Sequence, residues 1–496
     1  MGHQIVVNRR QLIVLESLTL LTLLILIFWS VEPLLEEWSI LNAFNAHGLG
    51  YLQSFAPEIT MRPLHLTPFV MEWVLGNGRP VGVAAGIGVL LIMRYFVVRW
   101  AVSPFFHGHS RWIAATLAAV LVAWPGVWLG RFSSAQLSAV FFFAALGFAI
   151  RLFERWSSAW AIGCACSVLL LLMTYQGLAL CLIAIPFVSL FWHPTGDSMA
   201  TAIEKNEKLN KAARILLAVT VGFAFYGAYW YVMSRVMGNA GYEGALAADS
   251  SRLLSAAGLW SHIEAAFATA YGQEALLLPF LILIALFLRW HESGTLGFVK
   301  SRFLTGSVLF LFVVLLPLLS LIYVNELHIH DIDRVLFPVS MGFVLVCIAI
   351  LRQSQNEHPV HSKLLSASII VMTILTMSGL VAHQIKHYGY IQNIVIGQTL
   401  AATKQNNSLS VVVRDMTGTL GDVYTLLPPT LTDALSVYGK SITATICTPS
   451  SVDRIHPVAR RYPIPSTRRC EELPAAPDNT LFLSARLVDG LLTVGP

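Results

Sequence analysis

The sequence predicts an all-α polytopic membrane bundle of about eleven transmembrane helices, followed by a small C-terminal α/β extracytoplasmic domain. Hydrophobic residues make up 56% of the 496 residues and charged residues only 12%, and the mean hydropathy is +0.68. A soluble protein carries about 25% charged residues, so most of this chain must face lipid or other helices. The net charge is only +5 and the basic residues are scattered, which argues against a nucleic-acid partner.

The spans follow from apolar runs, because a helix needs about 20 mostly apolar residues to cross a bilayer. The first run follows Arg9 and Arg10, and no small-residue cleavage site follows it. We therefore interpret it as a retained anchor and not as a signal peptide. The predicted spans lie near 12–30, 80–98, 112–129, 136–152, 158–174, 177–192, 214–233, 275–289, 304–324, 335–351 and 365–383.

The distribution of Lys and Arg predicts a cytoplasmic N-terminus and an outer C-terminal tail, because cytoplasmic loops carry an excess of these residues. The predicted outer loops before the last span contain only Arg62, Arg79, Arg131, Arg235, Arg252 and Arg334. The predicted inner segments contain Arg9, Arg10, Arg94, Arg99, Arg111, Arg151, Arg155, Lys205, Lys208, Lys211, Arg214, Arg289, Lys300, Arg302, Arg352 and Lys363.

Two adjacent carboxylates, Glu36 and Glu37, follow the first span in a long first outer segment, residues 31–79. Burial near the membrane interface would disfavour ionisation of both and raise at least one pKa. A carboxylate tuned in this way can act as a general base. The alternative, which composition alone favours, is that both are ordinary solvated acids.

Polar residues also mark the outer ends of later spans. Tyr175 and Gln176 end an otherwise apolar run, where polar groups are costly unless paired and are often functional. Arg131 and Gln136 flank the third-to-fourth connection. Arg334 opens a span from the outside and suits a phosphate, which its planar fork can bind bidentately. An ion pair of Arg334 with Asp331 or Asp333 is the alternative.

Two further outer loops carry patterns with a functional and a structural interpretation. His328 and His330 with Asp331 and Asp333 could bind a divalent metal, but we interpret them as solvated loop residues and predict no cofactor. Residues 251–271 show apolar residues at helical spacing, which indicates an amphipathic interfacial helix.

The composition changes after about residue 384, which divides the chain into a transmembrane domain (1–383) and an outer α/β domain (384–496). Short strands are predicted at 411–413 and 481–483, and a helix at 430–437 after two prolines. Cys447 and Cys470 are the only cysteines of this domain, and an oxidising compartment would allow them to form a disulfide.

Taken together, these short motifs resemble those of the GT-C superfamily of integral-membrane glycosyltransferases. The resemblance is nearest to bacterial enzymes that transfer a sugar from a polyprenyl phosphate, such as O-antigen glucosyltransferases. It covers roughly the first 350 residues and departs from the family in having Glu where many members have Asp. It rests on Glu36-Glu37-Trp38, Arg62-Pro63-Leu64, Tyr175-Gln176 and Arg334 before Phe337-Pro338.

The resemblance implies an inverting displacement at the outer face of the cell membrane. Glu36 or Glu37 would deprotonate an acceptor hydroxyl, and the choice between them stays open. Tyr175 and Gln176 would position the sugar. The donor phosphate would be bound by Arg62, Arg334, Arg131 and His65. The implied partners are a polyprenyl-phosphate-linked sugar, a glycan or lipid-linked acceptor, and membrane lipid.

Three other functions share parts of this pattern. A transporter or flippase of lipid-linked sugars would often show internal repeats and charges at the bilayer midplane, whereas here the polar residues gather at one rim. A glycan polymerase or ligase would share the topology and the outer arginines. A non-catalytic scaffold for envelope assembly is the third alternative.

Overall fold

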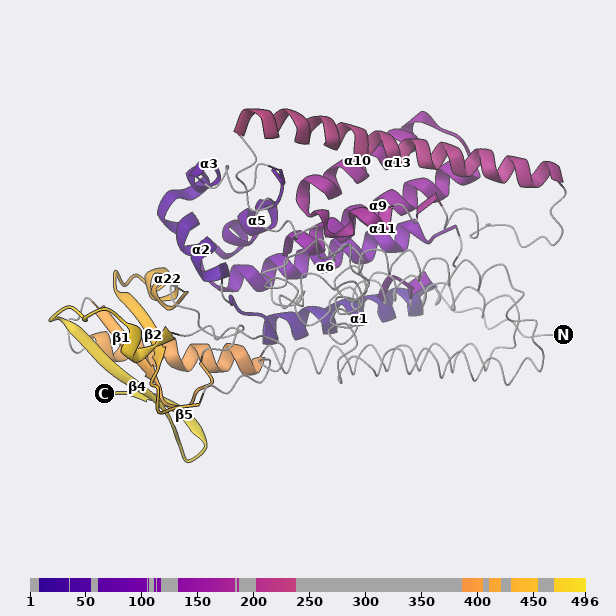
Figure 1. Ribbon diagram of the computed structural model, residues 1–496. Coiled ribbons are helices and arrows are strands. Elements are labelled where there is room, and N and C mark those ends of the chain that lie inside the picture. Colours follow the sequence, from indigo (N-terminus) through magenta and orange to yellow (C-terminus); the bar gives the residue numbers. More distant parts are fainter. Residues whose placement is uncertain are drawn as a thin grey trace.

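The computed structural model is mostly helical, with a small sheet near the C-terminus (Figure 1). The predicted spans 275–289, 304–324, 335–351 and 365–383, most of 112–129, and the predicted helix 251–271 lie outside the described residues. The structure describes residues 9–34, 36–54, 61–104, 106, 111–112, 114–116, 133–182, 185–186, 202–237, 386–404, 410–420, 430–453 and 468–496.

Helices occupy five of the predicted spans: α1 (Arg9–Ser30), α6 (Val81–Ala101), α9 (Ser133–Glu154), α10 (Ser158–Thr174) and α13 (Ala202–Met237). Within the described residues, three helical stretches are long and apolar enough to cross a membrane, namely Val81–Ala101, Ser133–Glu154 and Leu209–Val236. Glu16–Ser30 and Ser158–Thr174 are shorter apolar helices. Association with a membrane is therefore supported, whereas the count of eleven spans is not.

The predicted span 177–192 differs from a regular crossing helix where the structure describes it. Its start consists of a 3-10 turn, η2 (Gln176–Leu178), and a four-residue helix, α11 (Ala179–Leu182). The extended backbone of Tyr175 separates these short elements from α10. The helix therefore ends at Thr174, directly before the polar Tyr175-Gln176 pair.

The long helices lie side by side in Figure 1, where α9 packs between α6 and α10, and α10 packs against α13. A Cβ on Gly147 of α9 would collide with the Trp100 ring of α6. Small residues allow this close approach of helices in membranes. Apolar side chains that the described helices leave exposed suit contact with lipid, among them Ile13, Leu18, Ile25, Leu217, Phe225 and Val236.

Three of the arginines predicted to be cytoplasmic gather around the C-terminal end of α6. Arg99 Nε donates to Glu16 Oε1 at 2.7 Å, and Arg111 Nε donates to the Arg99 carbonyl oxygen at 2.8 Å. Arg151 Nη2 donates to the Trp100 carbonyl oxygen at 2.9 Å. Three arginines therefore lie together at one end of the bundle, and the prediction that this end is cytoplasmic stays a prediction.

The structure corrects the assignment of Arg94 to a cytoplasmic segment. Arg94 is counted as an inner residue, yet it lies within α6 and is wholly buried. Its Nη1 donates to Gln136 Oε1 of α9 at 3.4 Å. A count of loop charges cannot separate a buried intrahelical arginine from one in a neighbouring loop, so Arg94 does not contribute to the sidedness argument.

The first outer segment folds into short helices at the opposite end of the bundle (Figure 1). These are α2 (Glu36–His47), η1 (Gly48–Gly50), α3 (Tyr51–Ser54) and α5 (Thr67–Gly76). Phe44 of α2 packs with Leu66 and Phe69 in one buried cluster. Asn77 and Gly78 adopt positive φ values of 49° and 75°, which end α5 and turn the chain toward α6.

The C-terminal domain contains a five-stranded sheet with the order β3-β2-β1-β4-β5. β1 pairs in parallel with β2 and β4, whereas β5 pairs with β4 in antiparallel fashion. The predicted strands and helix are confirmed. The elements are β1 (Ser410–Asp415), α22 (Thr430–Val437), β2 (Thr443–Thr448), β3 (Arg468–Arg469), η5 (Cys470–Glu472), β4 (Thr480–Val488) and β5 (Leu491–Gly495).

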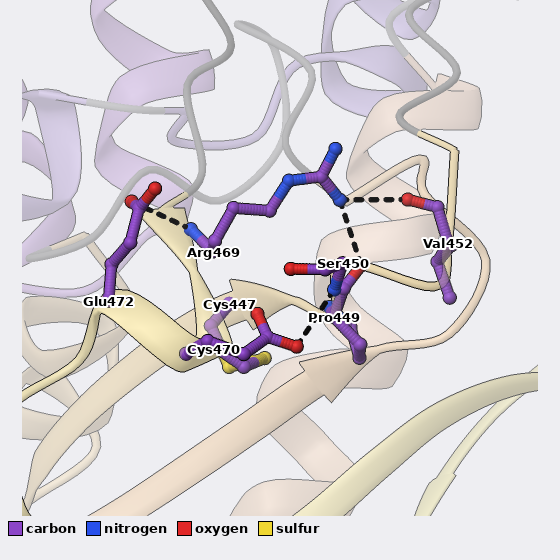
Figure 2. Close-up of a disulfide and its surroundings, with 8 residues drawn as sticks. Cys447, Pro449, Ser450, Val452, Arg469, Cys470 and Glu472 are labelled. Carbon is purple, nitrogen blue, oxygen red and sulfur yellow. Dashed lines mark hydrogen bonds between the residues drawn. A yellow bond between two sulfur atoms is a disulfide. The ribbon is translucent and has the colours of Figure 1, made fainter.

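Cys447 and Cys470 form the predicted disulfide (Figure 2), with their Cα atoms 4.9 Å apart. It joins the end of β2 to η5. Beside it, Arg469 Nη1 donates to the carbonyl oxygens of Pro449 and Val452 at 2.8 and 2.9 Å. The bond and these contacts fix the sheet's β2–β3 edge and fit an oxidising compartment.

Trp38 of α2 lies in the hydrophobic core of the C-terminal domain. It is 1% exposed and packs in one cluster with Val395 of the helix over 386–404 and with Leu431 of α22. Its Nε1 donates to Gln392 Oε1 at 3.3 Å. The first outer segment thus supplies a core side chain to the domain at the other end of the sequence.

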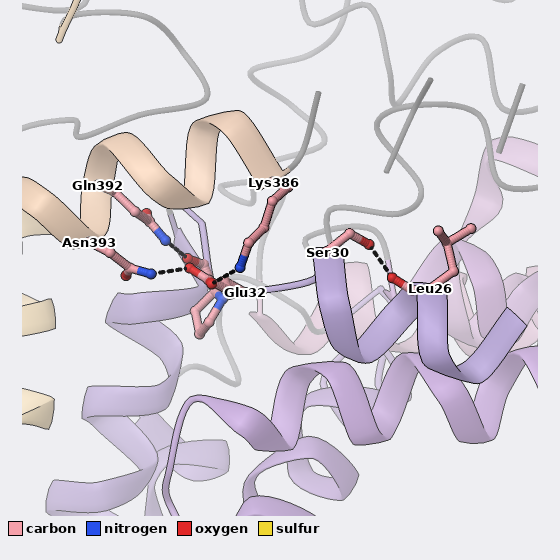
Figure 3. A network of polar contacts seen from close by, with 7 residues as sticks. Leu26, Ser30, Glu32, Lys386, Gln392 and Asn393 are labelled. Atoms are coloured by element: carbon pink, nitrogen blue, oxygen red, sulfur yellow. Dashed lines mark hydrogen bonds and ion pairs between the residues drawn. The ribbon is translucent and has the colours of Figure 1, made fainter. Parts of the chain in front are cut away.

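Polar contacts surround this apolar junction. Asn42 Nδ2 donates to Asp433 Oδ1 at 3.0 Å, and the Ser39 hydroxyl also donates to Asp433. Figure 3 shows Glu32 between Lys386 and Asn393, whose side-chain nitrogens lie 3.3 and 2.6 Å from its carboxylate oxygens. The segment from Glu32 to Asn42 is therefore bound to the C-terminal domain along its length.

We expect Trp38→Ala to lower the free energy of unfolding of the C-terminal domain by about 3–5 kcal/mol, because the substitution leaves a cavity in a buried core. Limited proteolysis and hydrogen exchange of residues 386–496 measure this change. Trp29→Ala is the matched control, since Trp29 is 48% exposed. Equal protection in the two variants would contradict the role of Trp38.

Candidate functional site

The second half of the first outer segment lies against the end of α10. The amide of Leu64 donates to the Met173 carbonyl oxygen at 3.0 Å. His65 Nδ1 lies 3.3 Å from the carbonyl oxygen of Thr174. This backbone pairing places Arg62 beside the residues that follow α10.

Tyr226 of α13 joins both pieces. Its hydroxyl donates to the Met61 carbonyl oxygen at 2.9 Å and contacts the Gln176 side-chain amide. Arg62, His65, Tyr175, Gln176 and Tyr226 are all half-buried, and we call them the junction cluster. Four of the five are predicted site residues, from two segments more than 100 positions apart, and the structure brings them to one place.

The chemistry of the junction cluster suits an anionic, hydroxyl-rich ligand. A guanidinium gives a planar set of N–H donors, and imidazole, phenol and carboxamide groups add donors and acceptors. Charged donors to phosphate oxygens are about twice as strong as neutral ones. These side chains therefore include the kinds of donor and acceptor groups that bind phosphates and sugar hydroxyls.

Tyr226 is the member that the sequence reasoning misses. It lies inside the predicted span 214–233, where an aromatic side chain among apolar ones is interpreted as facing lipid or packing in the core. The available signal is the run Tyr226-Gly227-Ala228-Tyr229-Trp230-Tyr231, which concentrates aromatic residues near one end of a span. Tyr and Trp are enriched at both membrane–water interfaces, so this run indicates that this part of α13 lies near an interface.

The two predicted acids lie at the other end of α2 from its contact with α5. Glu37 is buried, and its Oε2 accepts the Leu34 amide at 2.9 Å. Glu36 is exposed in the first turn of α2. The structure therefore gives Glu37 a role in shaping the turn before α2 and leaves Glu36 facing outward next to the C-terminal domain.

Two of the predicted donor-binding arginines, Arg131 and Arg334, lie outside the described residues. The candidate metal ligands in the loop before Arg334 also lie outside the described residues, namely His328, His330, Asp331 and Asp333. Within the part of the chain that the structure describes, no group of three or more His, Cys, Asp or Glu side chains could hold a metal ion.

Glu72 is a buried carboxyl that the sequence reasoning does not single out. It lies on α5, which at ten residues is too short to cross a bilayer. Burial raises the pKa of Glu72 well above its usual range, and contact with the Ser133 hydroxyl of α9 partly offsets the rise. A Cβ on Gly86 of α6 would collide with Glu72 Cγ, so the side chain fills a notch in the bundle.

Glu72 and the junction cluster both lie next to α9, because α5 and η2 each contact that helix. Ser133 begins α9, and Gln136 one turn later accepts a hydrogen bond from Arg94. η2, which begins at Gln176, also contacts α9. The sequence signal for Glu72 is a charged residue inside the apolar run from Pro68 to Leu75, because charged residues in apolar runs of membrane proteins are often functional.

Comparison with known proteins finds no matching family model, no matching curated protein and no matching solved structure.

We expect Glu72→Gln to remove a pH-dependent loss of stability. Because burial raises the pKa of Glu72, the native state retains a proton that the unfolded state releases as the pH climbs above the unfolded-state value of about 4.3, so stability falls with rising pH. As the pH rises from the unfolded-state value toward the raised native pKa, the melting temperature of the wild type should therefore fall progressively relative to that of Glu72→Gln. Glu154→Gln, at an exposed position, should follow the wild type. Parallel melting curves for the wild type and Glu72→Gln would show that burial leaves this carboxyl unperturbed.

Proposed function

We propose that this chain is a membrane glycosyltransferase that moves a sugar from a polyprenyl-phosphate donor to a cell-envelope glycan or lipid-linked acceptor. The proposal includes a polytopic topology of about eleven spans, a cytoplasmic N-terminus and an extracytoplasmic C-terminal domain. It takes the resemblance to the GT-C superfamily as its starting point.

One observation carries the proposal: the first outer segment contacts the end of α10, Tyr226 of α13 and the C-terminal domain. Its 61–65 stretch contacts the end of α10 and Tyr226 of α13. Its Trp38 enters the core of the disulfide-bonded C-terminal domain. The basic residues Arg99, Arg111 and Arg151 lie at the other end of the bundle. This arrangement supports one continuous site at a single membrane rim, as a lipid-linked donor requires.

Glu36 is the better candidate for the general base. A base must come within hydrogen-bond reach of the acceptor hydroxyl, and Glu36 is exposed whereas Glu37 is buried against the Leu34 amide. In the proposed step Glu36 takes the proton of the acceptor hydroxyl. The freed oxygen attacks the anomeric carbon, and the bond from that carbon to the phosphate oxygen breaks.

The leaving lipid phosphate takes the electron pair of that bond, so its negative charge grows in the transition state. Arg62 and His65 of the junction cluster, with Arg131 and Arg334 as further candidates, would stabilise this charge. Tyr175 and Gln176 would hold the sugar hydroxyls. A single displacement inverts the anomeric centre.

We expect Glu36→Gln to lower the rate of sugar transfer at least about 100-fold, the usual contribution of a general base. Glu37→Gln should lower it less than about tenfold, because a carboxamide oxygen can still accept the Leu34 amide. The assay measures transfer from a radiolabelled polyprenyl-phosphate sugar by purified protein in nanodiscs.

Glu32→Gln serves as the carboxylate control in the same segment, because Glu32 already pairs with Lys386 and Asn393. Full activity in both Glu36→Gln and Glu37→Gln would remove the proposed base. Donor binding without any product in the wild type would favour transport or a scaffold instead.

A further inference from the structure

The sheet of the C-terminal domain has two different faces. One face buries Val411, Val413 and Leu483 against α22 and the helix over 386–404. Side chains alternate along a strand, so the neighbouring residues point to the opposite face. There Arg414 and Phe482 are exposed, Phe482 by 44%.

The register of the strands brings these side chains together. Val412 of β1 pairs with Phe482 of β4, and Arg414 pairs with Ser484. Arg414 therefore lies diagonally across from Phe482, with its Cζ 5.0 Å from the ring centroid. Arg486 is also exposed and follows Ser484 by two residues on the same face.

Hydroxyl groups border this group of side chains. Ser484 lies between Phe482 and Arg486 on β4, and Thr493 pairs with Arg486 from β5. Neighbouring strands are about 4.8 Å apart and alternate residues about 6.7 Å apart. All of these groups therefore fit within the length of two or three sugar rings. We call Arg414, Phe482 and Arg486 with these hydroxyls the Arg–Phe face.

The composition of the Arg–Phe face indicates a binding surface. Parallel strands are usually covered on both sides, and arginine and aromatic residues are the types enriched where proteins bind partners. The two guanidinium groups select an anion, because their forks match the geometry of a carboxylate. The exposed ring offers an apolar surface on which the C–H groups of a sugar ring can pack.

We propose that the Arg–Phe face binds an acidic oligosaccharide, which is the acceptor glycan of the proposed transfer. Its carboxylates pair with Arg414 and Arg486, a sugar ring packs on Phe482, and its hydroxyls bond to Ser484 and Thr493. Identification of this glycan as the acceptor rests on the proposed function, whereas the binding itself does not.

A direct binding measurement tests the proposal on the full-length protein in phosphatidylcholine nanodiscs. The probes are a fluorescent hexamer of galacturonic acid and the neutral maltohexaose of equal length. We expect the acidic probe to bind and the neutral one to bind at least about tenfold more weakly. Phe482→Ala and Arg414→Gln should each weaken the acidic probe about tenfold, roughly 1.4 kcal/mol. Phe482→Tyr, which retains the aromatic ring, should restore most of the affinity.

Arg214→Gln is the matched control, because Arg214 also lies over an exposed aromatic ring, with its Cζ 5.3 Å from Trp156. It should leave binding unchanged. Equal binding of the two probes, or unchanged binding in Phe482→Ala and Arg414→Gln, would overturn the proposal. Displacement of the acidic probe by phosphatidylglycerol vesicles but not by excess unlabelled hexamer would also overturn it, in favour of a lipid surface.

Glu36→Gln separates this proposal from the proposed function. It should abolish transfer and leave binding of the acidic hexamer intact. If the wild type transfers no sugar but Phe482→Ala still loses binding, the proposed function fails and the glycan-binding face stands.

Discussion

The indole of Trp38 is buried in the core of the C-terminal domain. There it donates a hydrogen bond to Gln392, which lies 354 residues further along the chain. A tryptophan removed from water contributes several kcal/mol to the contact that buries it. The same helix, α2, packs Phe44 against Leu66 and Phe69. α2 therefore packs against the C-terminal domain through Trp38 and against α5 through Phe44. The positions of α5 and of the C-terminal domain both depend on α2.

These two contacts of α2 explain how candidate residues that are distant in the sequence come to share one end of the molecule. α5 follows the 61–65 stretch, which the Leu64–Met173 and Tyr226–Met61 hydrogen bonds fix to the bundle. At the start of α2, Glu36 is exposed and Glu37 accepts the Leu34 amide, whereas Arg62 lies beside the residues that follow α10. A substrate with a lipid tail at the rim and an acceptor on the domain would meet along α2.

Local patterns predict much of this architecture. The apolar run 158–174 has the bounds of α10, two prolines predict the start of α22, and the cysteine pairing within one domain is confirmed. These features depend on neighbours in sequence. The entry of Trp38 into the C-terminal core, by contrast, depends on tertiary packing that no local pattern encodes.

The candidate site is predicted less completely. The meeting of the 61–65 stretch with Tyr175 and Gln176 follows from shared sidedness, but the hydroxyl of Tyr226 and the buried carboxyl of Glu72 do not. Glu37 resembles Glu36 in sequence, and only the fold distinguishes the buried side chain that accepts the Leu34 amide from the exposed one. The count of eleven spans is not supported: three described helical stretches are long and apolar enough to cross a membrane, and four of the predicted spans lie wholly outside the described residues.

The central claim is that the first outer segment and the C-terminal domain lie together on the outer side of the membrane. The most direct measurement labels single cysteines in intact cells with a membrane-impermeant maleimide, at the exposed positions Ser54→Cys, Asp478→Cys and Arg155→Cys. We expect the first two to be labelled from outside and Arg155→Cys to be labelled only after permeabilisation. Labelling of Ser54→Cys and Asp478→Cys from opposite sides, or of both only after permeabilisation, would contradict it.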